Sequence, residues 1–164
     1  MKTTIYSMIF LLCLIVSSQG QLKEHDNLMG GTLGFWARNS SPTFGFNYEN
    51  QLTQAGIGTI GVGALLRYSS FNNEPERFSN TFIGGQANYN FNQIGTGKFV
   101  PFAGIVLGFY SSSPNGSSLK QNGLWTWGQA GMRYFFSPAV AGVVRFGLGN
   151  FNFNALELGV DFKF

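Results

Sequence analysis

The chain has 164 residues, a length that suits a single domain. Charged residues make up only 10% of it, whereas an ordinary soluble domain has about 25%, and aromatic residues reach 16%. The formal net charge is +3 and no cluster of Lys or Arg is present to follow a phosphate backbone, so nucleic acid is excluded as an expected partner.

The first predicted element is a cleavable export signal over residues 1–20. A basic start precedes an apolar run over residues 5–16, and small and polar residues follow up to Gly20. This order is typical of a secretory signal peptide, whereas a membrane-spanning helix needs roughly 20 apolar residues. Cleavage after Gly20 would remove Cys13, the only cysteine. The mature chain, beginning at Gln21, is therefore predicted to have no thiol and no disulfide.

Residues 21–27 are predicted to be a short lead before the folded domain. His25, the only histidine, lies there between Glu24 and Asp26. These three residue types can bind a metal, but a solvated terminus is the favoured interpretation. No histidine remains in the rest of the chain to act as a general base for a Ser or Thr nucleophile. The sequence therefore predicts no enzyme, no metal site and no cofactor.

Eight strand-like segments follow, separated by Asn, Ser, Gly and Pro. Within them apolar residues alternate with polar or small ones, as expected for a strand with one apolar face. The predicted strands cover residues 28–39, 43–50, 57–71, 78–92, 99–111, 124–136, 139–149 and 154–164. Eight strands of this length are typical of a small, closed, antiparallel up-and-down barrel, which is assigned here to residues 28–164.

Every charged residue within a predicted strand falls on the polar face of that strand. The set comprises Arg38, Glu49, Arg67, Arg133, Arg145, Glu157, Asp161 and Lys163. A charge that faces lipid at the bilayer centre of a barrel costs roughly 2–4 kcal/mol, which is enough to clear that face of charges. The pattern predicts a transmembrane barrel with apolar residues outward. The competing hypothesis, a soluble barrel of the lipocalin type, would have the opposite orientation.

Charges that point into a barrel must be paired, because an isolated buried charge is costly. If the last hairpin turns near residue 151, Arg145 lies opposite Glu157 and Asp161 opposite Ala141, over which Arg133 can reach Asp161. The predicted interior network consists of Glu49, Arg67, Arg133, Arg145, Glu157 and Asp161. The favoured interpretation is a salt-bridge network that plugs the lumen, and the alternative is a polar lining that selects a solute.

Three tryptophans, Trp36, Trp125 and Trp127, also fall on the inward face, toward one mouth of the predicted barrel. Trp more often lies in the lipid-facing aromatic girdle. Either a bulge near Thr126 shifts the frame, or aromatic side chains fill the mouth. A ligand-stacking cup at the mouth is a further hypothesis.

Three segments make the chain similar to the small eight-stranded outer-membrane barrels of the OmpA/OmpX type. They are VPFAGIVLGFY (100–110), MRYFFSPAVAGVVRFGLG (132–149) and the closing LGVDFKF (158–164). The resemblance implies that both termini and the turns near 53, 95 and 137 face the periplasm, and that the loops near 40, 74, 116 and 151 face outward. It also implies that the outer-membrane assembly machinery recognises a C-terminal signal consisting of Leu158, Val160, Phe162 and Phe164.

The sequence supports three functional hypotheses. The leading one is a monomeric, non-enzymatic barrel of the cell outer membrane, in contact with its lipid, with a structural or surface role and an interior plugged by polar and aromatic side chains. The second is a narrow passive channel for small or apolar solutes. The third is surface binding or adhesion through short outer loops, among which residues 111–122 form one of the longer ones.

Overall fold

The computed structural model describes residues 21–35, 41–73, 76–94, 97–115, 121–148 and 156–164. The predicted signal at 1–20, and the expectations for Trp36 and Arg38, lie outside these ranges. No helix in the described part of the chain is long and apolar enough to cross a membrane.

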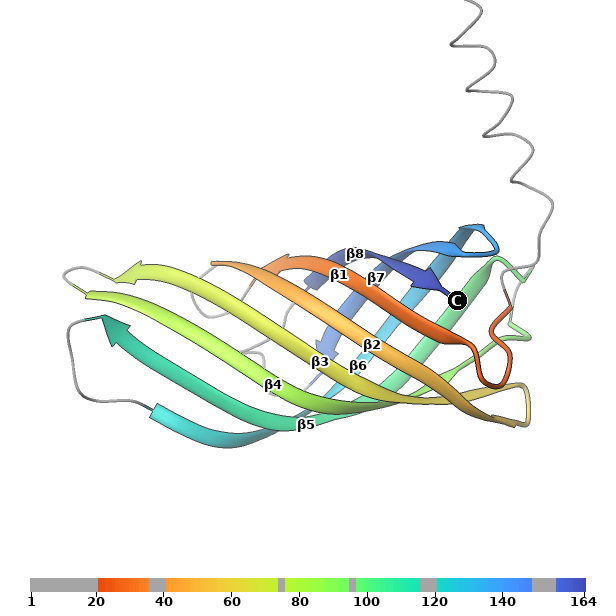
Figure 1. Cartoon of the computed structure of the whole chain (residues 1–164), viewed down its shortest axis with the longest axis horizontal. Coiled ribbons are helices and arrows are strands. Elements are labelled where there is room, and N and C mark those ends of the chain that lie inside the picture. The colour runs from red at the N-terminus through yellow and green to blue at the C-terminus, as the bar shows by residue number, and fades with distance from the viewer. Residues whose placement is uncertain (1–20, 36–40, 74–75, 95–96, 116–120, 149–155) are drawn as a thin grey trace, which may run out of the picture.

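The described chain is one antiparallel sheet of eight strands that closes on itself (Figure 1). The strands are β1 (Asn27–Phe35), β2 (Pro42–Ala55), β3 (Gly58–Asn73), β4 (Glu76–Asn90), β5 (Phe99–Asn115), β6 (Gln121–Ser137), β7 (Val140–Leu148) and β8 (Leu156–Lys163). Each strand pairs with the next along the chain, and β1 pairs with β8 to complete the circle. The all-β, up-and-down, eight-stranded barrel predicted from the alternation is confirmed.

The end of β2 lies further along the chain than predicted. A turn was expected near residue 53, but β2 continues to Ala55 and the turn falls at Gly56, which has a φ of 56°. Glycine adopts this left-handed conformation without the steric cost of a side chain. The register between β2 and β3 shifts between Gln51 and Thr53. Such a bulge inserts an extra residue into one strand. The alternation of apolar and polar residues is therefore interrupted there, and the sequence pattern does not show that the strand continues.

The predicted outer loop at 111–122 is also shorter than expected. β5 continues to Asn115 and β6 begins at Gln121, and their register runs without a shift to the Ser112–Gln121 pair. The prediction was wrong because Ser, Pro and Asn are common in turns, whereas here residues 111–115 continue the pairing of β5 with β4. The ladder of backbone hydrogen bonds decides the structure here rather than residue propensity.

The four central strands are much longer than the strands near the seam, which is the β1–β8 pairing that closes the barrel. β3 to β6 have 16, 15, 17 and 17 residues, whereas β1, β7 and β8 have 9, 9 and 8. In Figure 1 the tips of β3, β4 and β5 extend past β1 and β8 on one side. We call this side, where β1, β3, β5 and β7 end and β2, β4, β6 and β8 begin, the loop end. The opposite side, which holds the C-terminus, is the terminal end.

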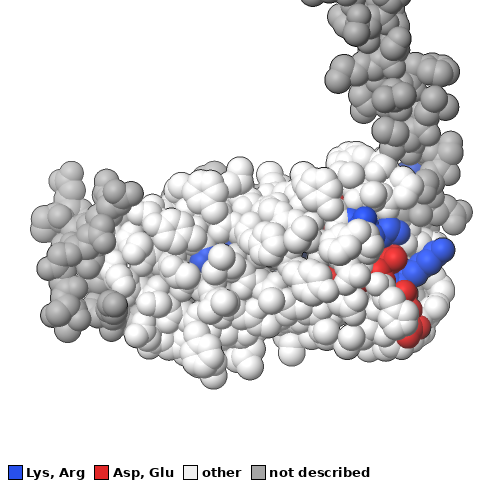
Figure 2. All heavy atoms as spheres, in the orientation of Figure 1, with Lys and Arg blue, Asp and Glu red and all other residues white. Residues whose placement is uncertain are grey.

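The outer wall is apolar. Ile105, Phe109 and Ile83 are 65%, 68% and 60% exposed on the outside, where their alternating neighbours point inward. In Figure 2 the visible wall is almost entirely uncharged, and Lys, Arg, Asp and Glu gather at the terminal end. The opposite orientation, with charges outward and apolar side chains around a lumen, is therefore wrong for this chain.

Two apolar clusters lie inside the barrel. The terminal cluster consists of Leu22, Leu28, Val100, Phe135 and Ala141. The loop cluster consists of Leu65, Phe82, Val106 and Trp127, with Tyr110 and Trp125 packed against it. Between them lie the buried charged and amide side chains described below.

Candidate functional site in the barrel interior

Glu157 is the meeting point of two arginines at the start of β8. Arg67 donates from Nε to Oε1 and from Nη2 to Oε2, the second at 2.8 Å, which is the paired geometry that a guanidinium and a carboxylate favour. Thr32 donates to Oε2 at 3.1 Å, and Arg145 Nη1 lies 3.8 Å from the same oxygen. The sequence predicted Arg145 as the partner of Glu157, and the register does pair these residues. The closer contact, however, is with Arg67.

A second centre forms around Arg133 on β6. Its Nε donates to Asp161 Oδ2 at 2.8 Å and its Nη2 to Glu49 Oε2 at 2.8 Å. Asp161 lies opposite Ala141, whose small side chain leaves room for this contact from the strand beyond. Both the pairing and the reach over Ala141 were expected from the sequence. Arg133, Glu49 and Asp161 are each at most 2% exposed, so all three charges are held away from solvent.

Amide side chains surround the carboxylate of Glu49. Asn88 and Asn90 donate to its two oxygens at 2.7 Å each, and Gln51 donates to Oε1 at 2.9 Å. Gln129 extends the chain of amides by donating to Asn88 at 2.7 Å. A carboxylate surrounded by donors in this way is stabilised in its charged form.

Sequence reasoning did not assign these amides to the network, although Gln86, Asn88 and Asn90 occupy alternate positions of β4. Gln86 is part of the same set, because it accepts a hydrogen bond from Gln129. Three amides at alternate positions of one strand are the signal that identifies them. The prediction covered only charged residues, because a buried charge without a partner is far more costly than a buried amide.

Arg145 is the least well paired of the three buried arginines. It is fully buried, and its Nη1 donates to Asn47 Oδ1, whereas its Nε and Nη2 have no hydrogen-bond partner within the described structure. Its guanidinium carbon lies 5.6 Å from the centre of the Phe102 ring, and that of Arg133 lies 4.4 Å from the same ring. The face of the Phe102 ring therefore provides a cation–π interaction to the Arg145 guanidinium, which has no closely paired carboxylate of its own.

Glycines make space for this network. A Cβ on Gly45 would lie 3.0 Å from the Arg67 guanidinium carbon, and one on Gly61 would collide with the Glu49 carboxylate. These positions lie beside the charged side chains on neighbouring strands. The high glycine content therefore has a direct structural use, because larger residues here would displace the arginine and carboxylate groups.

Trp127 and Trp125 point inward, and the pairing of β5 with β6 has no register shift at Thr126. Trp127 is 5% exposed and packs on Phe82 with ring centres 4.6 Å apart, while Trp125 lies 6.4 Å from Tyr110. Of the two explanations for inward tryptophans, the described residues fit the one in which aromatic side chains fill the lumen.

The proposed assembly signal lies on the outer face of β8 and at the chain end. Leu158, Val160, Phe162 and Phe164 are 55%, 40%, 53% and 66% exposed. Their polar neighbours on the strand, Glu157 and Asp161, point inward into the two ion-pair centres. One strand therefore presents the apolar face and supplies two of the three interior carboxylates, the third being Glu49 of β2.

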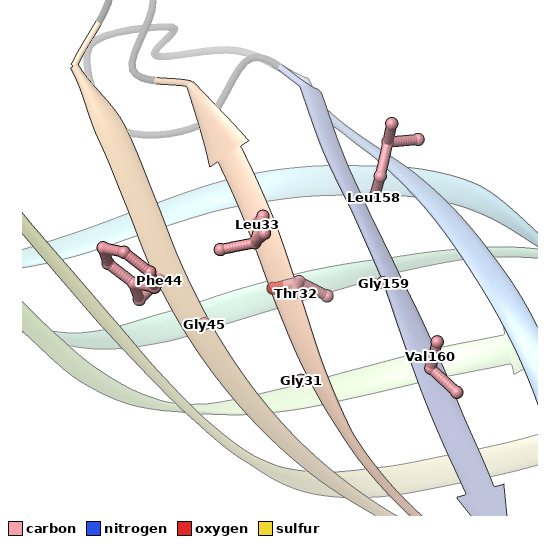
Figure 3. Close-up of a pocket in the computed structure, with 8 residues that line it drawn as sticks. All are labelled: Gly31, Thr32, Leu33, Phe44, Gly45, Leu158, Gly159 and Val160. Carbon is pink, nitrogen blue, oxygen red and sulfur yellow. The ribbon is translucent and has the colours of Figure 1, made fainter.

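A shallow apolar hollow of about 410 Å³ lies on the outer wall, over Gly31 (Figure 3). Leu33, Phe44, Leu158 and Val160 surround it, and it exists because Gly31 has no side chain between them. It contains no carboxylate, imidazole or thiol. In the described ranges no three His, Cys, Asp or Glu side chains gather as a metal site. The interior ion pairs join side chains of β2, β3, β6, β7 and β8, so the network links strands that are far apart around the barrel.

The comparisons with known proteins agree on the fold. No protein-family model matches the sequence, and no significant relative is found among curated proteins. Solved structures do match: the N-terminal β-barrel domain of Pseudomonas aeruginosa OprF is 17% identical with a TM-score of 0.56, covering 86% of this chain and 98% of that one.

Two further structures extend this finding. The attachment invasion locus protein Ail of Yersinia pestis, in complex with the heparin analogue sucrose octasulfate, is 12% identical with a TM-score of 0.58, covering 87% of this chain and all of that one. A structure from the de novo design of transmembrane β-barrels is 13% identical with a TM-score of 0.54, covering 88% and 99%. The chain therefore has the fold of the small eight-stranded outer-membrane barrels, as the sequence resemblance implied.

Proposed function

We propose that this protein is a monomeric integral barrel of the cell outer membrane, exported by its N-terminal signal, with a structural or surface role and no enzymatic activity. The observation that carries the proposal is the separation of side chains across the wall. Three arginines and three carboxylates, on β2, β3, β6, β7 and β8, are buried inside, and large apolar side chains cover the outside. A bilayer makes this distribution favourable, whereas water would penalise the apolar wall.

The same observation supports a lumen that does not conduct. Three arginines and three carboxylates neutralise each other across the barrel, and an apolar cluster lies on either side of them. An eight-stranded barrel has little more interior room than its own side chains fill. A narrow passive channel is therefore the less favoured alternative.

Single-channel recording in a planar bilayer tests this closure. The refolded protein is expected to give no steady conductance steps. A variant with Phe82→Ala and Trp127→Ala, which empties the loop cluster, serves as the matched comparison. Steady steps from the unaltered protein would establish the channel hypothesis, whereas steps from the variant alone would show that these side chains close the lumen.

Surface binding is a second candidate, favoured by the four long central strands. Within the described residues, β3 beyond Ser69 is paired only with β4, and β6 before Gly128 is paired only with β5. Ail, which has a similar fold, is described by its name as an attachment protein and was solved with a heparin analogue. Replacing residues 111–122 with a two-residue turn is expected to abolish the binding of cells to heparin-coated beads, with dextran-coated beads as the control. This candidate would be rejected if the loop replacement left heparin binding unchanged, or if cells with the unaltered protein bound neither kind of bead.

A further inference from the structure

Residues 21–27 were expected to be a solvated lead, but β1 already begins at Asn27, and residues 21–26 contact the barrel at the terminal end of the lumen. We propose that Gln21–Asp26 is a built-in plug, which seals this end of the barrel and latches the first strand to the last. The proposal concerns the chain's own segment and goes beyond the structural role argued above. Three independent sets of contacts support it.

The first set is apolar. Leu22 is only 3% exposed, and it packs in the terminal cluster with side chains from four different strands. These are Leu28 of β1, Val100 of β5, Phe135 of β6 and Ala141 of β7. A cluster that joins side chains of β1 with those of β5 and β6, on the opposite part of the circle, spans the lumen, and Leu22 belongs to it. Leu22 therefore closes the cross-section instead of covering one wall.

The second set pairs the backbone of the lead with the barrel. His25 N donates to Gln51 O at 2.7 Å, and Gln51 N donates to Asp26 O at 2.9 Å. The Leu22 carbonyl accepts from Asn92 Nδ2 at 2.8 Å. A loose terminus would leave these groups to water, whereas here buried barrel residues satisfy them.

The third set is centred on Lys163, at the end of β8. Its ammonium group donates to the Gln21 carbonyl at 3.2 Å and lies 3.3 Å from Asp26 Oδ2. Asp26 Oδ2 in turn accepts from Lys23 N at 2.8 Å, which fixes the turn of the lead. The ammonium lies 5.8 Å from the centre of the Phe135 ring. One side chain of the last strand therefore holds both ends of the plug.

These contacts meet at the seam of the barrel. Next to Lys163, Asn27 and Phe164 exchange two backbone hydrogen bonds of 3.0 Å, which end the β1–β8 pairing. The plug site uses residues from β1, β2, β5, β6, β7 and β8, so it is complete only when the barrel has closed. The plug therefore acts as a latch that forms after closure and then keeps water from the terminal cluster.

Thiol accessibility tests the plug. In the full chain with Cys13→Ser, Val100→Cys supplies one reporter thiol inside the terminal cluster, where the native residue is fully buried. The purified, detergent-solubilised protein is treated with a charged, water-soluble maleimide. With the lead intact the thiol is expected to react slowly, and Leu22→Ser is expected to raise the rate at least tenfold. Glu24→Ser, at an exposed position of the same segment, should leave the rate unchanged.

Two additions keep the test decisive. Lys163→Met removes both polar contacts to the lead but keeps an apolar stem. It should also raise the reaction rate of the thiol at position 100, and it replaces Leu22→Ser in the test if that variant does not fold. A second reporter, Ser69→Cys, lies fully buried on the loop side of the barrel and should not respond to the lead. Fast reaction at position 100 with the lead intact, or no difference between Leu22→Ser and Glu24→Ser, would overturn the plug. Fast reaction of both reporters would instead contradict the closed lumen of the proposed function.

Discussion

Glu157 illustrates how each buried charge in this barrel depends on its partners. It accepts hydrogen bonds from Arg67 and Thr32 and lies 3.8 Å from Arg145. Taking such a group out of water is costly, and the cost is offset only when its partners satisfy it. Removing one member leaves the others buried and uncompensated.

Glu157→Gln is therefore expected to lower the free energy of unfolding by about 3–5 kcal/mol, because two buried guanidiniums lose their shared carboxylate. Urea unfolding of the protein refolded in detergent micelles measures this change. Glu24→Gln, at an exposed position in the lead, is the control and should have little effect. Equal effects of the two substitutions would mean that the interior ion pairs do not stabilise the fold.

The buried arginines are expected to differ in importance. Arg133 makes three hydrogen bonds to Asp161, Asn90 and Glu49, whereas Arg145 makes one and has two nitrogens without a partner. Replacing a poorly paired buried charge with an apolar residue of similar volume is often neutral, whereas breaking a good pair costs about 3–5 kcal/mol.

Arg133→Met should thus destabilise the barrel by at least about 2 kcal/mol more than Arg145→Met does, because it breaks the better-paired site. The same urea titration gives both values. A larger effect of Arg145→Met would show that this residue has interactions beyond the single strong hydrogen bond to Asn47.

At the scale of the element, β8 combines three tasks. Its outer side chains extend the apolar wall, its carboxylates complete both ion-pair centres, and its pairing with β1 closes the sheet. The outward Phe162 and Phe164 are not needed for any of the interior contacts. A role in recognition by the assembly machinery can therefore be separated from folding.

Phe164→Ser is expected to reduce the amount of protein that reaches the outer membrane several-fold, while refolding of the purified chain into detergent stays unchanged. The reason is that the terminal aromatic contributes to the proposed assembly signal but contacts no interior group. Quantitative blotting of membrane fractions measures delivery. Phe136→Ser, at a comparably exposed aromatic of β6, is the control. Equal losses from both substitutions would contradict a signal located at the C-terminus.

The strand number and the inward charges could be predicted because strand alternation is a local property of the sequence. The register of the last hairpin also followed, since it pairs Arg145 with Glu157 and Ala141 with Asp161. The ends of β2, β5 and β6 could not be predicted, because hydrogen bonding to the neighbouring strand extends them through residues that are typical of turns.

Two features of the interior depend on contacts that sequence spacing does not reveal. Arg67 reaches Glu157 although the two residues are 90 positions apart and lie on strands that do not pair with each other. The docking of Leu22 likewise depends on a cluster that joins side chains of β1, β5, β6 and β7. Such contacts arise only when the sheet closes, so no local pattern encodes them.

At the scale of the whole molecule, the central claim is the orientation of the two faces. Apolar side chains of each strand are expected to contact acyl chains, and the charges of the same strands are enclosed. Moving a charge to the outside would cost roughly 2–4 kcal/mol at the bilayer centre. The arrangement also predicts that the protein fractionates with membranes and requires detergent for extraction.

The most direct test uses nitroxide spin labels on the outer wall of the protein reconstituted in lipid bilayers. Labels at Ile105, Phe146 and Leu158, each at an exposed apolar position, report collision rates with oxygen, which concentrates in hydrocarbon, and with a water-soluble nickel chelate. The account predicts frequent collisions with oxygen and few with nickel at all three positions. Frequent collisions with nickel at these positions would contradict it, because the apolar wall would then face water.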